Sequence, residues 1–127
     1  NGMVVWQDSN ADEDIKAIRI INYGRNGSVI PVAILAFDET EPTVSLDDIG
    51  NGLITWKEAS DQKIYAKKVI NYSLVGDKFR VTNSSNNERK PSVYVNNNNK
   101  GIITLSQDVA GPSTYIYGNR IVDLEPQ

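Results

Sequence analysis

The chain has 127 residues, carries 16 acidic and 13 basic side chains, and contains neither cysteine nor histidine. The missing cysteine excludes disulfides and cysteine nucleophiles, and the missing histidine excludes serine–histidine catalysis and histidine-ligated zinc. The net charge of −3 comes without a basic block that would follow a phosphate backbone. The apolar runs are far shorter than the ~18 residues of a membrane span. We therefore expect a single non-enzymatic domain with no nucleic-acid partner and no membrane insertion.

An internal repeat of about 49 residues organises the chain. The offset increases by one residue upstream and by three residues downstream, in polar segments where changes of length are tolerated. Equivalent positions in successive repeats include Trp6 and Trp56, Ile15 and Ile64, Ala17 and Ala66, Pro42 and Pro91, and Tyr65 and Tyr117. A repeat of this length is typical of solenoids, propellers and other arrays.

Short β-branched runs separated by Asn, Asp and Gly clusters predict strands throughout, and no window of helical length has an uninterrupted apolar stripe. Taken in chain order, ten strands are expected at residues 3–6, 15–21, 30–32, 42–44, 53–56, 63–70, 79–81, 91–95, 102–105 and 115–122. We therefore expect an all-β domain with essentially no helix.

The strands differ in how they are expected to be covered. Residues 3–6, 53–56 and 102–105 are apolar at nearly every position, which predicts burial on both faces. Residues 63–70 alternate between apolar and charged side chains and are expected to be half exposed. Pro42 leads a predicted first strand, a position that suits proline.

A four-stranded unit with a bulky residue on an inner strand is typical of a propeller blade. We therefore predict a partial β-propeller, with a partial first blade at 1–41, a second blade at 42–90 and a partial third blade at 91–127. A β-sandwich is the alternative, although its strands occupy non-equivalent places and would not explain a true repeat. The residues expected to anchor the blades are Trp6, Trp56, Tyr65 and Tyr117.

Two segments also carry a family resemblance. Val-Trp-Gln-Asp at 5–8 followed by Asp-Ile at 14–15, and Thr-Trp-Lys-Glu at 55–58 followed by Lys-Ile-Tyr-Ala-Lys-Lys-Val at 63–69, resemble the "AWxD … IYAQ(R/K)" repeats of bacterial secreted and surface-attached proteins. The resemblance implies propeller blades and a secreted or cell-surface location. The third repeat departs from the pattern with Leu105 in place of Trp, which implies a degenerate or terminal blade.

About two and a half blades fall short of the ~4 to 8 that a propeller needs. We therefore expect self-association or completion by adjoining repeats. Ile34, Leu35 and Phe37 either extend a fourth strand into the core or form an interface patch, because the second repeat is polar at the equivalent residues 82–86.

One acidic loop is a candidate for calcium, the only cofactor the sequence suggests. Asp8, Asn10, Asp12 and Asp14 place oxygen ligands on alternate residues, as calcium prefers. The loop lacks the usual glycine and the downstream bidentate glutamate, and Asp-rich hairpin loops also arise for turn reasons alone.

The remaining carboxylates suggest no catalytic pair. The Asp-Glu pair at 38–39 and the Asp-Asp pair at 47–48 fall in predicted loops and are expected to be solvated. The sequence therefore favours a non-catalytic extracellular module for protein interaction or scaffolding. The alternative is a carbohydrate-binding, lectin-like module whose tyrosines stack on sugars.

Overall fold

A computed structural model describes residues 1–9, 12–109 and 113–122. These residues form ten strands and no helix, which confirms the all-β prediction, and accordingly none of them belongs to a helix long and apolar enough to cross a membrane. The strands are β1 Gly2–Ser9, β2 Glu13–Ile21, β3 Gly24–Ala33, β4 Glu39–Leu46, β5 Gly52–Glu58, β6 Lys63–Ile70, β7 Ser73–Arg80, β8 Glu88–Val95, β9 Lys100–Asp108 and β10 Thr114–Val122.

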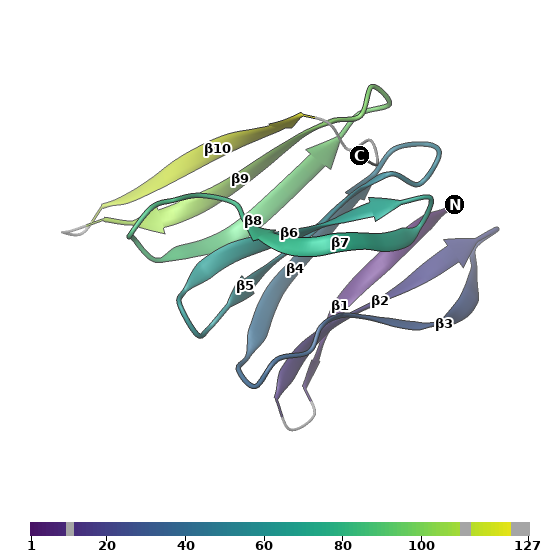
Figure 1. Cartoon of the computed structure of the whole chain (residues 1–127), viewed down its shortest axis with the longest axis horizontal. Coiled ribbons are helices and arrows are strands. Elements are labelled where there is room, and N and C mark those ends of the chain that lie inside the picture. The colour runs from purple at the N-terminus through teal and green to yellow at the C-terminus, as the bar shows by residue number, and fades with distance from the viewer. Residues whose placement is uncertain (10–11, 110–112, 123–127) are drawn as a thin grey trace.

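The described strands form three antiparallel sheets, each a meander of sequence neighbours. The N-terminal sheet contains β1, β2 and β3, the central sheet β4 to β7, and the C-terminal sheet β8, β9 and β10. Figure 1 shows them stacked in chain order, with the four-stranded central sheet in the middle. Each repeat of the sequence therefore corresponds to one sheet.

Two equivalent turns make the fourth strands longer than predicted. Asn22 and Tyr23 both have positive φ, at 47° and 63°, and Asn71 and Tyr72 have almost the same values, 47° and 62°. A two-residue turn with positive φ at both positions matches the right-handed twist of a hairpin. As a result β3 begins at Gly24 and β7 at Ser73, and each continues through the segment that the sequence suggested was a loop.

The first strands carry a β-bulge at their prolines. Glu41 and Lys90, which directly precede Pro42 and Pro91, have φ values of 56° and 53°, and the strand register shifts at both places. A bulge accommodates a residue that cannot donate a ladder hydrogen bond. The expectation that proline begins the strand was therefore wrong, because β4 and β8 begin three residues earlier, at Glu39 and Glu88.

The core consists of two clusters, one on each face of the central sheet. Towards the N-terminal sheet, Ile54, Trp56 and Val69 pack with Ile15 and Ala17. Towards the C-terminal sheet, the cluster combines Leu53, Ile64, Ala66 and Val81 with Val95, Ile103 and Leu105. Residues of β5 enter both clusters, which confirms that this strand is covered on both faces.

The equivalent strands β1 and β9 are covered on one face only. Val4 is 49% exposed and Ile102 is 44% exposed, although both belong to runs that were expected to be buried throughout. That expectation was wrong because the N-terminal and C-terminal sheets lie at the ends of the described stack, so each has only one neighbouring sheet.

Adjacent sheets are in closest contact through the first strand of the later sheet, β4 in one case and β8 in the other. β4 packs against β1 and β2, and β8 packs against β4, β5 and β6. The equivalent turns after β4 and β8 are also joined, since the Asp48 amide donates to Asn97 Oδ1 at 3.1 Å and Asn97 Nδ2 donates to Asp48 Oδ2 at 2.6 Å. Neighbouring sheets are thus in contact on the side of their first and second strands. Grooves open between them on the side of the later strands, β3, β7 and β10.

Candidate functional site

The N-terminal sheet has an uncovered apolar face, which we call the Trp face. Val4, Trp6 and Ile20 share this face, because they alternate with the residues that point to the central sheet. Ile18, which pairs with Val4, lies on the same face and is only 6% exposed. Trp6 and Ile20 are partly buried, and Val4 is the most exposed of the four. No other described sheet packs on this face.

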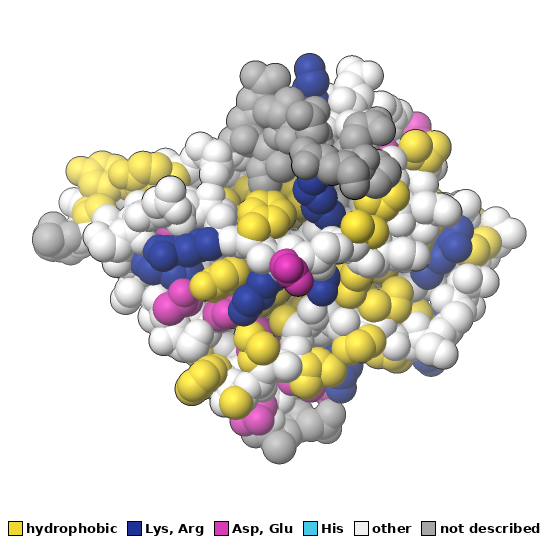
Figure 2. Space-filling view, in the orientation of Figure 1, with side chains coloured by type: hydrophobic (Ala, Val, Ile, Leu, Met, Phe, Trp, Pro, Cys, Tyr) yellow, Lys and Arg dark blue, Asp and Glu magenta, His cyan; other side chains and the backbone are white. Residues whose placement is uncertain are grey.

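The C-terminal sheet has an uncovered face as well, which we call the Ile face. It carries Tyr94, Ile102 and Ile116, with exposed fractions of 64%, 44% and 82%. Gly118 lies beside Ile102, so the face is shallow at this point. Apolar side chains are visible at the surface over β10 in Figure 2. An apolar face this open on an ordered sheet is typical of an interaction surface.

Both faces repeat positions that are buried in the central sheet. Val4 is equivalent to Ile54 and Ile116 to Ile64, and both central-sheet residues have 0% exposure. The difference in burial therefore arises because no further described sheet packs on these faces, and not from a change to polar residues.

The four predicted anchors lie in different environments. Trp56 is completely buried, and its Nε1 donates to Glu58 Oε1 at 3.2 Å. Tyr65 is partly buried and packs against the core cluster that contains Trp56, and burial raises its pKa to about 12. Trp6 lies on the uncovered Trp face, and Tyr117 on β10 is 46% exposed. Only Trp56 therefore anchors the contact between two described sheets from a fully buried position.

Ile34, Leu35 and Phe37 follow the end of β3 and do not extend it. Their exposed fractions are 57%, 39% and 59%, so they do not contribute a longer strand to the core. Ile34 and Leu35 border an apolar groove of about 470 Å³ that also reaches Trp56 and Lys78. Apolar side chains stand out over this connection at the lower left of Figure 2. An interface at these residues stays a prediction.

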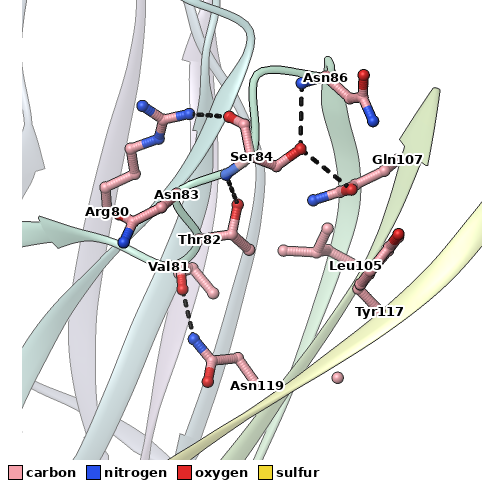
Figure 3. Close-up of a pocket in the computed structure, with 11 residues that line it drawn as sticks. Arg80, Val81, Thr82, Asn83, Ser84, Asn86, Leu105, Gln107, Tyr117 and Asn119 are labelled. Carbon is pink, nitrogen blue, oxygen red and sulfur yellow. Dashed lines mark hydrogen bonds between the residues drawn. The ribbon is translucent and has the colours of Figure 1, made fainter. Parts of the chain in front are cut away.

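A polar groove of about 540 Å³ occupies the equivalent place between the central and C-terminal sheets. Residues 81–84, which are equivalent to 32–35, form one wall, and Tyr117 and Asn119 of β10 form the other (Figure 3). The Asn119 side chain donates to the Val81 carbonyl, and the Arg80 guanidinium donates to the Ser84 carbonyl. The two grooves thus share a location in the repeat and differ in polarity.

A buried carboxylate supports the polar groove from behind. Glu88 is fully buried and accepts hydrogen bonds from the Ile64 amide at 2.9 Å, from Gln107 Nε2 at 3.3 Å and from the Thr82 hydroxyl. Ser84 Oγ bonds in turn to Gln107 Oε1 at 3.2 Å. This network fixes the connection between β7 and β8, so the groove wall is preorganised.

The equivalent carboxylate of the previous repeat is poorly satisfied. Glu39 is also fully buried, yet among the described residues its carboxylate accepts a single hydrogen bond, from the Leu35 amide to Oε2 at 3.4 Å. Its Oε1 has no hydrogen-bond partner among the described residues. Burial raises the pKa of Glu39 to about 7, and the Leu35 amide acts in the opposite direction. The expectation of a solvated Asp38-Glu39 turn was therefore wrong for Glu39.

Sequence reasoning missed both buried glutamates, because charged residues are expected at the surface. The repeat itself contained the signal, since Glu39 and Glu88 each stand three residues before the aligned prolines. Of the other pair, Asp47 is buried in its turn and accepts from the Asn51 amide at 2.7 Å, whereas Asp48 is exposed.

The candidate calcium loop is described only in part, since Asn10 lies outside the described residues. Asp8 and Asp14 face each other across the β1–β2 pair, and the Lys16 ammonium forms ion pairs with both. The hydrogen bond to Asp8 raises the pKa of Lys16. Asp12 is exposed. No group of three ligand-type side chains converges among the described residues, and calcium binding stays a prediction.

No family model matches the chain, and neither a curated protein nor a solved structure is significantly similar to it.

Proposed function

We propose that this chain is a non-catalytic, propeller-type repeat module for protein interaction or scaffolding, completed by self-association or by adjoining repeats. The observation that carries the proposal is the pair of uncovered apolar faces, because Val4, Ile102 and Ile116 are exposed there while their central-sheet equivalents Ile54, Leu53 and Ile64 have no exposed surface. Exposed apolar surface of this kind is costly unless a partner covers it.

The arrangement of the sheets supports the propeller part of the proposal. Each sheet is a four-stranded meander or part of one, and neighbouring sheets pack face to face, with the first strand of the later sheet closest to the earlier one. Propeller blades are stacked in this way around an axis. The sequence resemblance described above supports a secreted or cell-surface setting.

The proposal is tested by measuring the mass of the purified chain in solution by light scattering over a range of concentrations. The control is a double variant, Val4→Asp with Ile116→Asp, which places a charge on each uncovered face. We expect the wild-type chain to associate and the double variant to be a monomer whose circular dichroism spectrum shows the same strand content, so that loss of association is not loss of folding. A wild-type chain that stays monomeric at every concentration would contradict self-association.

The polar groove favours a second candidate function, carbohydrate binding. Tyr117 offers an exposed aromatic ring across the groove from the amide of Asn83 and the hydroxyl of Ser84 (Figure 3). Sugars are bound by this combination of stacking and hydrogen bonds. Calorimetric titration with neutral oligosaccharides tests it, with Tyr117→Ala expected to abolish the heat of binding. Tyr115→Ala, at an exposed tyrosine outside the groove lining, is the matched control.

A further inference from the structure

The two uncovered faces are of different kinds, and the contacts inside the chain show how such faces pair. The central sheet has a face equivalent to the Trp face, which carries Ile54, Trp56 and Val69. This face packs on the side of the N-terminal sheet that carries Ile15 and Ala17. That side is equivalent to the Ile face, since Ile15 aligns with Ile116 through the repeat.

The second contact between sheets follows the same rule. Ile64 and Ala66 lie on the face of the central sheet that is equivalent to the Ile face. They pack with Ile103 and Leu105 of the C-terminal sheet, whose positions are equivalent to those of the Trp face. In both contacts among the described sheets, a face equivalent to the Trp face therefore packs on a face equivalent to the Ile face. Neither contact joins two faces of the same kind.

We infer that a second copy of this chain docks head to tail, with the Trp face of one copy against the Ile face of the other. This inference rests on the proposed function and specifies its partner. Each copy has one uncovered face of each kind. Ile64 and Ile103, the equivalents of Ile116 and Val4, already lie in one core cluster within the chain. Val4 is equivalent to Ile103, so Val4 of one copy would approach Ile116 of the next.

The inferred contact has a consequence for the assembly. A contact between unlike patches is heterologous, so it produces either a closed ring or an open chain of copies. Two copies with three described sheets each supply six sheets, which lies within the ~4 to 8 blades of known propellers, whereas three copies would exceed that range. A ring of two copies, of about 28 kDa or twice the 14.1 kDa of one chain, is therefore expected.

The test uses two single variants, Val4→Asp for the Trp face and Ile116→Asp for the Ile face. Both positions are exposed, so neither charge enters the core, and circular dichroism checks that each variant is folded. Ile49→Asp is the matched control, because Ile49 is 68% exposed in the turn between β4 and β5, away from both faces. Light scattering then measures each protein alone and the two face variants mixed in equal amounts.

We expect each face variant to be a monomer and the mixture to form a heterodimer, because one intact Trp face then meets one intact Ile face. The Ile49→Asp control is expected to associate like the wild type. Loss of association in only one face variant, or a mixture that stays monomeric, would overturn head-to-tail docking while leaving an interaction module intact. A monomeric wild-type chain would overturn both the inference and the self-association on which it rests.

Discussion

Replacing Glu39 with glutamine should stabilise the protein at neutral and alkaline pH. Glu39 has no exposed surface, and its pKa rises from an ordinary value of 4.5 to about 7 because burial disfavours the carboxylate. Glu58 and Asp14 raise this pKa further, and Lys78 opposes them. At pH 8 the folded protein must hold this group ionised, at a cost that the unfolded chain avoids.

The magnitude follows from the two pKa values. One pKa unit corresponds to about 1.4 kcal/mol, so the ionised Glu39 side chain lowers the free energy of unfolding by about 3 kcal/mol. Below pH 4.5 the group is protonated in both states and costs nothing. As pH rises from 4.5 to about 7 the unfolded chain loses the proton first, so stability falls, and above that range the loss is complete. Total stabilities are only ~5–15 kcal/mol, which makes the effect measurable.

The assay is urea unfolding of the wild type and Glu39→Gln at pH 4.5 and pH 8, at one protein concentration. The variant should exceed the wild type by about 3 kcal/mol more at pH 8 than at pH 4.5. Parallel loss of stability in the two proteins would refute the reasoning.

Glu88→Gln is the matched control at the equivalent buried position. All three groups that contact this carboxylate donate hydrogen bonds to it. An amide has only one acceptor oxygen, so the variant leaves a donor unsatisfied and should lower the free energy of unfolding by about 1–3 kcal/mol. The two substitutions are therefore expected to change stability in opposite directions at pH 8, and a stabilising Glu88→Gln would contradict the network described here.

Two further predictions each compare a pair of residues by urea unfolding. Trp56→Ala should lower the free energy of unfolding by ~3–5 kcal/mol, and Trp6→Ala by clearly less, because Trp56 is fully buried between sheets while Trp6 lies on an uncovered face. Equal losses would contradict this assignment of faces. Gly50→Ala should cost at least ~2 kcal/mol, since its φ is +84° and a Cβ would clash with the Tyr72 ring. Gly27→Ala, with φ +80° but open space, should cost less, and the reverse order would argue against that packing.

The sequence predicts the strands well where the repeat and the apolar pattern agree. The predicted third strand at 63–70 has the observed bounds of β6, and the other strands differ mainly in their ends. The predicted fourth strands are shorter than the observed ones because Asn-Tyr does not resemble a common hairpin turn. The recurrence of Asn-Tyr at residues 22–23 and 71–72 is a signal in the repeat that could have located this turn.

The candidate sites are harder to predict from the sequence, because they depend on what lies across a sheet face. Val4 and Ile54 are both aliphatic at the same repeat position, yet one is half exposed and the other fully buried. Periodicity identifies an apolar face and does not say whether a neighbouring sheet covers it.

The most direct test of head-to-tail pairing is cross-linking of two single-cysteine variants, because the natural chain has no cysteine. Val4→Cys and Ile116→Cys are mixed in equal amounts, treated with a short bis-maleimide and analysed by mass spectrometry. Head-to-tail pairing predicts cross-links between positions 4 and 116 of different copies, with few links between like positions. Cross-links mainly between two copies of position 4, or between two copies of position 116, would contradict it.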